Sequence, residues 1–482
     1  MSWPSSYVNF KPLQFLFLLA LYLQMEDLLR RYLPAKPIYT QKEWRENELD
    51  AEVPYLQLSI LFTLSVFLFE RWLDNRPLSR FTSKNAKIPD SRIPHDIFHK
   101  SLEYGADKLA FSMFSGLLRL IEGLFLLYVG WLPYAWDLSE QTFEQRLGLL
   151  SPRSGALYRE CLITTGFVLI LLLQSTIVDT PFSLYFTFVV EQKHGFNKNT
   201  LGRFFKDMVL QLAVTTVILS PCVSIVIALA RLGGRFWSFY VWGFLFVFQI
   251  IMTYVYPEFI APLFNKYTPL EDGPLKTKIE ELAAKVKFPL TKLFVVDGSI
   301  RSGHSNAYMY GFGKNKRIVL YDTLIGQVTS DEIEAILGHE LGHWALSHTI
   351  QGFVIAQLYT GALFATFNFV SKSKPLFAAF GFSSTAAPIF IALTLFTSTY
   401  WTPVDKILTF LVNANTRRNE FAADAYSKDL GYSKHLAAGL IKLQIENKGN
   451  MVPDPLYSVY HFSHPPLVER LGPLESETKK IK

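Results

Sequence analysis

The chain of 482 residues has few cysteines and few charged residues for its length. Its two cysteines, Cys161 and Cys222, both lie in apolar runs, which excludes a disulfide framework and a four-cysteine metal site. Charged residues make up 18% of the chain, whereas a soluble globular protein has about 25%. Because 50% of the residues are hydrophobic and the mean hydropathy is +0.20, intrinsic disorder and an ordinary soluble enzyme are excluded as well.

The excess of positive charge is also small. The chain has 47 Lys and Arg residues against 41 Asp and Glu residues, a net charge of +6. Such an excess suits lipid headgroups and is too weak for the electrostatic footprint of a nucleic-acid-binding protein. We therefore expect a lipid bilayer, and no nucleic acid, among the partners.

Long apolar runs dominate the sequence. A membrane-spanning helix needs about 20 mostly apolar residues, and seven such runs together argue against the buried core helices of a soluble protein. They cover approximately Tyr55–Leu73, Ala110–Pro133, Glu160–Asp179, Met208–Ala230, Phe236–Tyr256, Gln351–Val370 and Thr385–Pro403. A shorter run, Leu13–Leu23, is followed by a polar tract with no small-residue cleavage site, so residues 1–54 are predicted to be an N-terminal extension that begins at the membrane interface.

The basic residues between the runs predict the orientation in the membrane, because cytosolic loops are enriched in Lys and Arg. Loop 74–109 contains seven Lys and Arg residues and loop 180–207 contains four, against three in loop 134–159 and two in the turn 231–235. This alternation predicts that the first two loops are cytosolic. The polar segment 257–350 and the tail from residue 405 then lie on the cytosolic side too.

Polar or ionisable side chains occur in neighbouring predicted spans. Arg119 and Glu122 lie three residues apart on one helical face, so we expect them to pair with each other or to face a water-filled interior. Gln174, Ser175 and Thr176 in the next span also indicate a polar interior. These spans are therefore not predicted to face lipid on all sides.

The polar segment 257–350 has the pattern of a compact soluble unit. Residues 274–288 form an amphipathic helix pattern, Leu293–Val296 is a short strand pattern, and Ala307–Tyr321 is typical of a hairpin. The second hairpin strand, Ile318–Tyr321, is predicted to be an edge strand to which an extended peptide could add by backbone pairing.

Residues 329–344 (TSDEIEAILGHELGHW) contain a motif that indicates a metal site with a general base. Thr329 and Glu332 form a capping-box pattern, so a helix is expected here independently of the motif. Within this helix His339 and His343 lie about one turn apart on one face and can share a metal ion. Glu340 flanks that position, where it can take a proton from water.

A zinc ion in a hydrolase has three protein ligands and one open position, so a third ligand must come from elsewhere. His348 follows His343 by five residues and lies off the metal-binding face. In residues 417–426 (RRNEFAADAY), Glu420 and Asp424 are four apart on a predicted helix, so one carboxylate can bind the metal while the other accepts a histidine ring N–H. Other histidines remain as alternative third ligands: His304, His435, His461 and His464.

Five separated motifs, taken in order, closely resemble those of the CAAX prenyl protease 1 family of integral-membrane zinc endopeptidases. They are EQKHGFN (191–197), SGHSNAYMYGFGKNKRIVLYDTL (302–324), HELGH (339–343), NEFAADAY (419–426) and FSHPPLVERL (462–471). The similarity covers nearly the whole chain from about residue 55. HELGH with the second acidic helix alone would indicate only a wider family, which includes bacterial heat-shock membrane proteases and a mitochondrial one.

The resemblance implies one zinc ion per chain, held by His339, His343 and Glu420, with Glu340 as general base and acid. Asp424 would be the hydrogen-bond partner of a histidine ligand.

Three further roles are implied in the same way. Asn306 would hold the substrate backbone, His464 would stabilise the oxyanion, and Arg470 would support the site. The oxyanion role agrees with the need for a hydrogen-bond donor opposite the metal in a tetrahedral intermediate.

The implied fold is a membrane α-helical one, with about seven transmembrane helices that enclose a chamber and a gluzincin-type α+β zinc metalloprotease domain on the cytosolic side. The implied substrates are prenylated CAAX proteins or peptides, from which the enzyme removes the C-terminal aaX tripeptide. A second upstream cleavage, as in a farnesylated lamin precursor, is implied for animal members. The implied location is the endoplasmic-reticulum membrane, extending to the inner nuclear membrane, and the terminal KKIK (479–482) is typical of a dilysine retrieval signal.

These expectations divide the chain into five parts and leave two alternative functions. The parts are an extension (1–54), five transmembrane helices (55–256), a cytosolic metalloprotease region (257–350), two transmembrane helices (351–404) and the C-terminal part of the catalytic domain (405–482). The alternatives are a zinc protease for membrane-protein quality control, and a membrane transporter or scaffold with a vestigial zinc site. An intact Glu340 argues against the last, because a vestigial site has no need of a general base.

Overall fold

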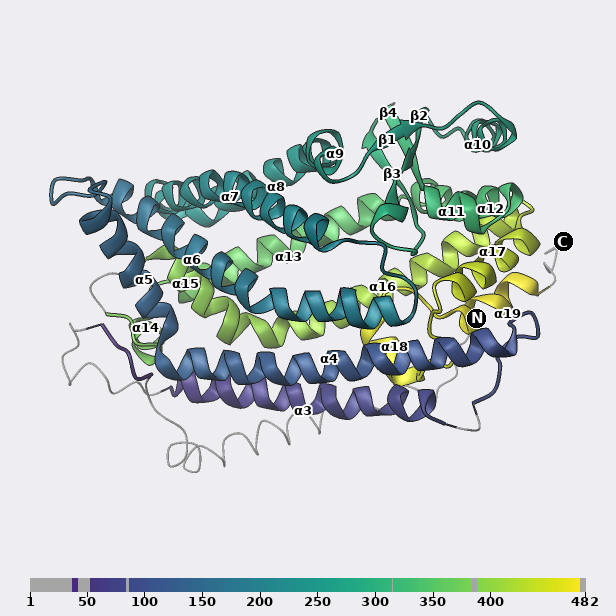
Figure 1. Cartoon of the computed structure of the whole chain (residues 1–482). Helices are drawn as coiled ribbons and strands as arrows, with labels where there is room; N and C mark the ends of the chain where they lie inside the picture. The colour runs from purple at the N-terminus through teal and green to yellow at the C-terminus, as the bar shows by residue number, and fades with distance from the viewer. Residues whose placement is uncertain (1–36, 42–52, 84–85, 314, 384–387, 477–482) are drawn as a thin grey trace.

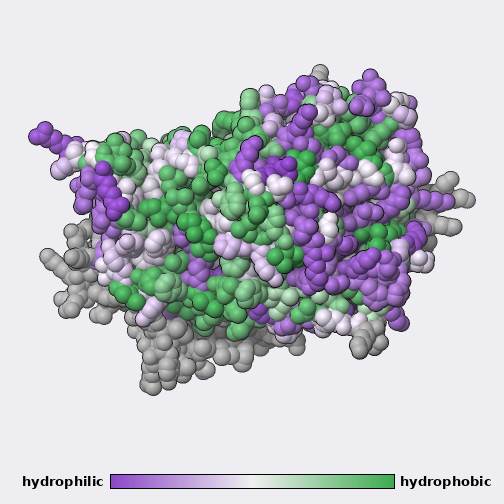
Figure 2. Space-filling model, in the orientation of Figure 1, coloured by the Kyte–Doolittle hydropathy of each residue, from purple (hydrophilic) through white to green (hydrophobic). Residues whose placement is uncertain are grey.

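The computed structural model describes residues 37–41, 53–83, 86–313, 315–383 and 388–476. Long helices run side by side through most of the molecule, and a small sheet with several shorter helices forms one end (Figure 1). Figure 2 shows hydrophobic residues gathered mainly over the long helices and hydrophilic residues mainly over the end that carries the sheet. The two surfaces therefore separate a membrane part from a water-facing part.

Within the described residues, six helices are long and apolar enough to cross a membrane, and they coincide with the first six predicted spans. They are α3 (Tyr55–Phe81), α4 (His95–Val129), α6 (Ala156–Tyr185) with its π-helical end η3 (Phe186–Glu191), α7 (Leu201–Leu232), η4 (Gly234–Phe236) with α8 (Trp237–Val255), η5 (Tyr256–Ile260) and α9 (Ala261–Phe264), and α13 (His348–Val370). Shorter helices complete this part: α5 (Trp131–Gln141), η2 (Thr142–Arg146) and α14 (Lys374–Ala379).

Residues 389–403 of the seventh predicted span, 385–403, lie in an uninterrupted helical run, and residues 385–387 lie outside the described residues. The run consists of α15 (Ile389–Phe396), the π-helical turn η7 (Thr397–Trp401) and the first residues of α16 (Thr402–Asp429). The predicted interfacial run Leu13–Leu23, most of the 1–54 extension and the terminal KKIK lie outside the described residues.

The two charged side chains singled out on α4 find partners on α6 rather than on their own helix. Arg119 of α4 forms an ion pair with Asp179 of α6 at 2.9 Å, and Glu122 accepts a hydrogen bond from Gln174 of α6 at 2.7 Å. The expected Arg119–Glu122 pair is therefore wrong, whereas Gln174 of the predicted polar group on α6 makes a polar contact with α4. The Arg119 and Asp179 side chains are 52% and 42% exposed, so this polar contact between α4 and α6 lies at the surface of the described residues.

The water-facing end is built on a four-stranded sheet with strand order β1-β2-β4-β3. Its strands are β1 (Tyr267–Pro269), β2 (Leu290–Val296), β3 (Ala307–Phe312) and β4 (Asn315–Tyr321), and only the β2–β4 pair is parallel. The β3–β4 hairpin confirms the predicted one. The prediction that Ile318–Tyr321 forms an edge strand is wrong, because β4 lies between β2 and β3.

The burial of β4 explains why it is an interior strand. Ile318, Val319 and Leu320 are all fully buried, and an uninterrupted buried run is typical of a strand covered on both faces. The free edge next to β4 belongs to β3.

Helices from both sides of α13 in the sequence complete this end of the molecule. They are α10 (Pro274–Lys285), η6 (Gly298–Ile300), α11 (Asp322–Gln327), α12 (Ser330–Ala345), α16, α17 (Ser433–Glu446), α18 (Pro455–His461) and α19 (Leu467–Glu475). One hydrophobic core joins α10, the sheet, α12 and α17, and it is separate from the core of the long helices. The predicted amphipathic helix contributes Ile279, Leu282 and Ala283 to it.

Candidate metal centre

Helix α12 begins as its sequence predicts. The Thr329 hydroxyl accepts a hydrogen bond from the Glu332 N–H, and the Glu332 carboxylate accepts one from the Thr329 N–H, which completes the capping box. The helix runs from Ser330 to Ala345 and carries His339 and His343 on one face. It is therefore a fixed scaffold for two ring nitrogens.

Two glycines of α12 allow α16 to approach closely. A Cβ atom at Gly342 would lie 3.1 Å from Cβ of Tyr426 and 3.2 Å from the Ala423 backbone, and one at Gly338 would lie 3.1 Å from Oγ of Ser427. Such distances are shorter than ordinary packing contacts, so larger residues would push the two helices apart. The glycines of the motif thus bring Glu420 of α16 to the histidine face.

Three donor side chains converge at this crossing. The Nε2 atoms of His339 and His343 lie 3.2 Å apart, and the Glu420 oxygens lie 3.4 Å and 3.3 Å from them. Within the described residues, these three form the group whose ligand atoms all lie within 4.8 Å of one another. Oε2 of Glu420 is buried without a hydrogen-bond partner, and a buried acceptor in that condition is costly unless a cation occupies the space beside it. Two imidazoles and a carboxylate with a further open position fit zinc.

The outer nitrogen of His339 is held by a buried ion pair. Nδ1 of His339 lies 2.8 Å from Oδ1 of Asp424, and Arg470 donates two hydrogen bonds to the same carboxylate, at 2.8 Å and 2.6 Å. Burial opposes charge on Asp424, but the hydrogen bonds from Arg470 and His339 hold the pKa of its carboxyl below the ordinary value. The ring orientation of His339 is thereby fixed.

The electrostatics of the inner residues follow from the same contacts. Burial lowers the pKa of His339, but its hydrogen bond with Asp424 and the nearby Glu420 carboxylate outweigh burial and raise that pKa to about 9. Burial likewise opposes charge on Glu420, yet the close ring nitrogens of His339 and His343 bring its pKa far below the ordinary value. Burial raises the pKa of Glu340, which makes that carboxylate a stronger base.

The remaining predicted residues fall in two places. Nε2 of His464 lies 3.2 Å from Oε1 of Glu420, and its side chain is 67% exposed, so it stands at the open side of the cluster. Asn306 is exposed just before β3, where its carbonyl accepts a hydrogen bond from the Tyr321 N–H at 3.1 Å. It thus lies at the start of the free sheet edge and outside the hydrogen-bonded group around Glu420.

The other histidines considered as the third metal ligand make contacts away from His339 and His343. His435 is exposed on α17, and His461 packs against the rings of Tyr457 and Tyr460. His304 lies with its Nε2 3.1 Å from Glu191 and its Nδ1 2.9 Å from Asn447. Among the candidates within the described part of the chain, Glu420 is the one that meets both histidines of α12.

His304 does have a structural consequence for Asn306. Glu191 is the last residue of the third long helix, and it also accepts a 2.5 Å hydrogen bond from the Tyr104 hydroxyl of α4. The His304 ring stacks on Phe196 with ring centroids 4.1 Å apart. The segment that carries Asn306 is therefore anchored to the membrane helices, a link that no local sequence pattern reveals.

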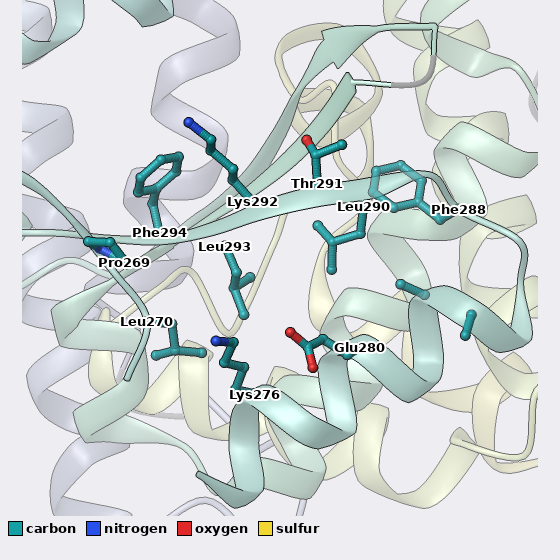
Figure 3. A pocket seen from close by; sticks show the side chains of 12 residues that line it. Pro269, Leu270, Lys276, Glu280, Phe288, Leu290, Thr291, Lys292, Leu293 and Phe294 are labelled. Atoms are coloured by element: carbon teal, nitrogen blue, oxygen red, sulfur yellow. The ribbon is translucent and has the colours of Figure 1, made fainter. Parts of the chain in front are cut away.

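A groove of about 580 Å³ lies between α10 and β2 (Figure 3). Lys276 and Glu280 of α10 face Leu290, Leu293 and other residues of β2 across it. None of the predicted site residues lines this groove. It is thus distinct from the metal centre.

Adding zinc to the metal-free protein is expected to stabilise it. At a free zinc concentration about 100 times the dissociation constant, the free energy of unfolding should rise by about 2.7 kcal/mol, because the folded state alone presents the assembled ligands. The measurement is thermal unfolding in detergent with and without zinc. His339→Ala should lose the increase and His435→Ala, an exposed histidine on α17, should keep it; an equal increase in both variants would place zinc elsewhere.

Two family models match consecutive parts of the chain. Residues 79–266 match a model described as CAAX prenyl protease N-terminal, five membrane helices, and residues 269–478 match a model described as Peptidase family M48.

Proteins from a plant, an animal and a yeast are similar to this chain over most of their length. A CAAX prenyl protease 1 homolog of Oryza sativa subsp. japonica is 44% identical over 436 residues, covering 89% of this chain and 99% of the relative. A CAAX prenyl protease 1 homolog of Homo sapiens is 38% identical and the CAAX prenyl protease 1 of Saccharomyces cerevisiae 37%, and each comparison covers 89% of this chain and 97% of the relative. The crystal structure of S. mikatae Ste24p matches the fold with a TM-score of 0.80 and 36% identity, covering 88% of this chain and 99% of that one.

Proposed function

The chain is a metallopeptidase of family M48 that belongs to its CAAX prenyl protease 1 group, and from this premise we propose that it removes the C-terminal aaX tripeptide from prenylated, including farnesylated, CAAX proteins. The observation that carries the proposal is the convergence of His339, His343 and Glu420 beside Glu340. The names of the relatives supply the substrate class. The chain itself supplies a hydrolytic centre at the water-facing end of a multi-pass membrane protein.

We further propose the location and environment of this centre. The basic residues of loops 74–109 and 180–207 support a cytosolic orientation of the metal centre. The membrane would be that of the endoplasmic reticulum. The helices would enclose a chamber, which the polar contacts between α4 and α6 support. A second upstream cleavage of a prelamin-like substrate, and a further location in the inner nuclear membrane, belong to the same proposal.

His339, His343 and Glu420 would hold one zinc ion, which supplies Lewis acidity that acidifies water and polarises a peptide carbonyl. Glu340 takes a proton from the attacking water while the water oxygen bonds to the carbonyl carbon of the peptide. His464, at the open side of the cluster, donates a hydrogen bond to the carbonyl oxygen as negative charge develops there. Glu340 then passes the proton to the leaving amine when the C–N bond breaks.

The roles of the outer residues follow from their positions. Asp424 and Arg470 keep His339 in the orientation that directs its Nε2 inward. Asn306, at the start of edge strand β3, would hold the backbone of an extended substrate. A peptide paired with β3 by its main chain would leave the choice of side chains loose.

The test compares a farnesylated C-terminal peptide with its unprenylated twin on the purified full-length chain. Chelator-sensitive release of the C-terminal tripeptide from the farnesylated peptide, with the twin cut poorly, is the expected result by mass spectrometry. Equal cleavage of both would move the function to membrane-protein quality control. Cleavage of neither by zinc-loaded protein would favour a non-catalytic transporter or scaffold.

A further inference from the structure

The two histidines of the metal centre differ in what holds their outer nitrogens. Nδ1 of His339 meets a carboxylate, Asp424, at 2.8 Å. Nδ1 of His343 meets a third imidazole instead, because Nδ1 of His348 lies 3.0 Å away. The two rings meet edge to face, with centroids 5.1 Å apart and planes at 68°.

This contact depends on a break between α12 and α13. On an unbroken helix, residues five apart point about 140° away from each other, so His348 could not reach the outer side of His343. The chain leaves the helix at Leu346, and Ser347 adopts a left-handed conformation with φ 58° and ψ 27°. Helix α13 then starts at His348, whose ring lies against that of His343.

The left-handed conformation is unfavourable for a residue with a Cβ atom, and serine is not one of the residues that adopt it readily. Such conformations persist where the surrounding structure holds them, and they are enriched at functional sites. Here the residue with this conformation directly precedes the histidine that makes the contact.

The chemistry of the contact follows from the direction of the inner nitrogens. Nε2 of His343 faces Nε2 of His339 and Glu420, so it is the nitrogen available to a metal ion. An imidazole that binds a metal through Nε2 carries its proton on Nδ1 and must donate it. A neutral His348 with its own proton on Nε2 offers a lone pair on Nδ1 to accept that hydrogen bond.

We propose that His348 is a positioning residue of the metal centre: it accepts a hydrogen bond from Nδ1–H of His343 and so fixes the tautomer and ring orientation with which His343 binds zinc. The inference rests on the proposed zinc site. It deepens that proposal, because each histidine ligand then has a partner on its outer nitrogen. His339 has the charged Asp424, which is held by Arg470, and His343 has the neutral His348.

The test measures the zinc affinity of the full-length protein by competition with a chromophoric chelator, starting from metal-free protein. Loss of an outer hydrogen-bond partner typically weakens metal binding by about 10- to 100-fold, and we expect His348→Ala to fall in this range. His348→Asn, whose side-chain oxygen can accept the same hydrogen bond, should recover most of the affinity. His435→Ala, an exposed histidine, should match the wild type.

Two further readouts separate positioning from a general loss of structure. The thermal midpoint of metal-free His348→Ala should equal that of the metal-free wild type, and its peptidase activity should return at saturating zinc. The visible spectrum of the cobalt-substituted protein should change in His348→Ala and return toward that of the wild type in His348→Asn. If His348→Ala does not fold, the affinity and cobalt spectrum of His348→Asn decide the question.

The outcomes keep the two proposals apart. Absence of zinc binding by the wild-type chain would overturn the proposed function itself. Wild-type zinc affinity in His348→Ala would overturn only the role of His348. Equal loss of affinity in the Ala and Asn variants, with a lower midpoint for both metal-free proteins, would also overturn it, because the residue would then act on folding.

Discussion

Glu340→Gln is expected to lower the turnover of a farnesylated CAAX peptide by about 10²- to 10⁴-fold, the range that a positioned general base contributes. The amide keeps the size and hydrogen-bonding groups of the side chain but cannot take a proton from water. Zinc should remain bound, because Glu340 is not among the three side chains whose donor atoms converge. The measurement pairs the rate of tripeptide release with the zinc content of the same sample.

A second glutamate on the same helix provides the matched control. Glu334 accepts a 2.5 Å hydrogen bond from the Tyr432 hydroxyl and lies away from the donor cluster, and Glu334→Gln retains an oxygen for that contact. It should cleave the peptide at nearly the wild-type rate. A Glu340→Gln enzyme that is fully active with zinc bound would exclude Glu340 as the base.

The helix that carries the metal motif was predictable because its signals are local. The Thr329–Glu332 capping box and the spacing of His339 and His343 need only the geometry of a single helix, and the capping box forms as expected. The meeting with Glu420 was one of several possibilities on sequence alone. It depends on the room that Gly338 and Gly342 leave for α16, which is a property of two helices together.

The predictions that differ from the structure were based on neighbours in the sequence, whereas the structure makes contacts between segments that are distant in the sequence. Arg119 and Glu122 are neighbours on one helix, but each has a partner on α6. Strand Ile318–Tyr321 lies close to the metal helix in sequence, yet β2 joins the sheet on its other side and makes it interior. His348 lies outside the metal-binding group, as expected, but the left-handed Ser347 ends the helix and brings His348 to the outer nitrogen of His343, which helix spacing alone does not predict.

Arg470→Met is expected to lower the free energy of unfolding by about 3–5 kcal/mol, the cost of leaving a buried charge without its partner. Arg470 and Asp424 are 9% and 3% exposed, so water cannot replace the lost hydrogen bonds. The same substitution should weaken zinc binding, because Asp424 would no longer be held against Nδ1 of His339. Unfolding in detergent by denaturant or heat and chelator competition measure the two effects.

The chain offers a control with a similar Arg–Asp contact and different burial. Arg92 donates to Asp90 at 2.8 Å and 2.6 Å, as Arg470 does to Asp424, but its side chain is 44% exposed and also pairs with the exposed Glu475 at 2.7 Å. Arg92→Met should therefore cost no more than about 1 kcal/mol. The double variant Asp424→Asn/Arg470→Met should be more stable than Arg470→Met alone, because it removes the uncompensated charge and keeps an oxygen for His339. If Arg470→Met and Arg92→Met cost the same, the buried pair does not stabilise the centre through charge, and geometry alone must orient His339.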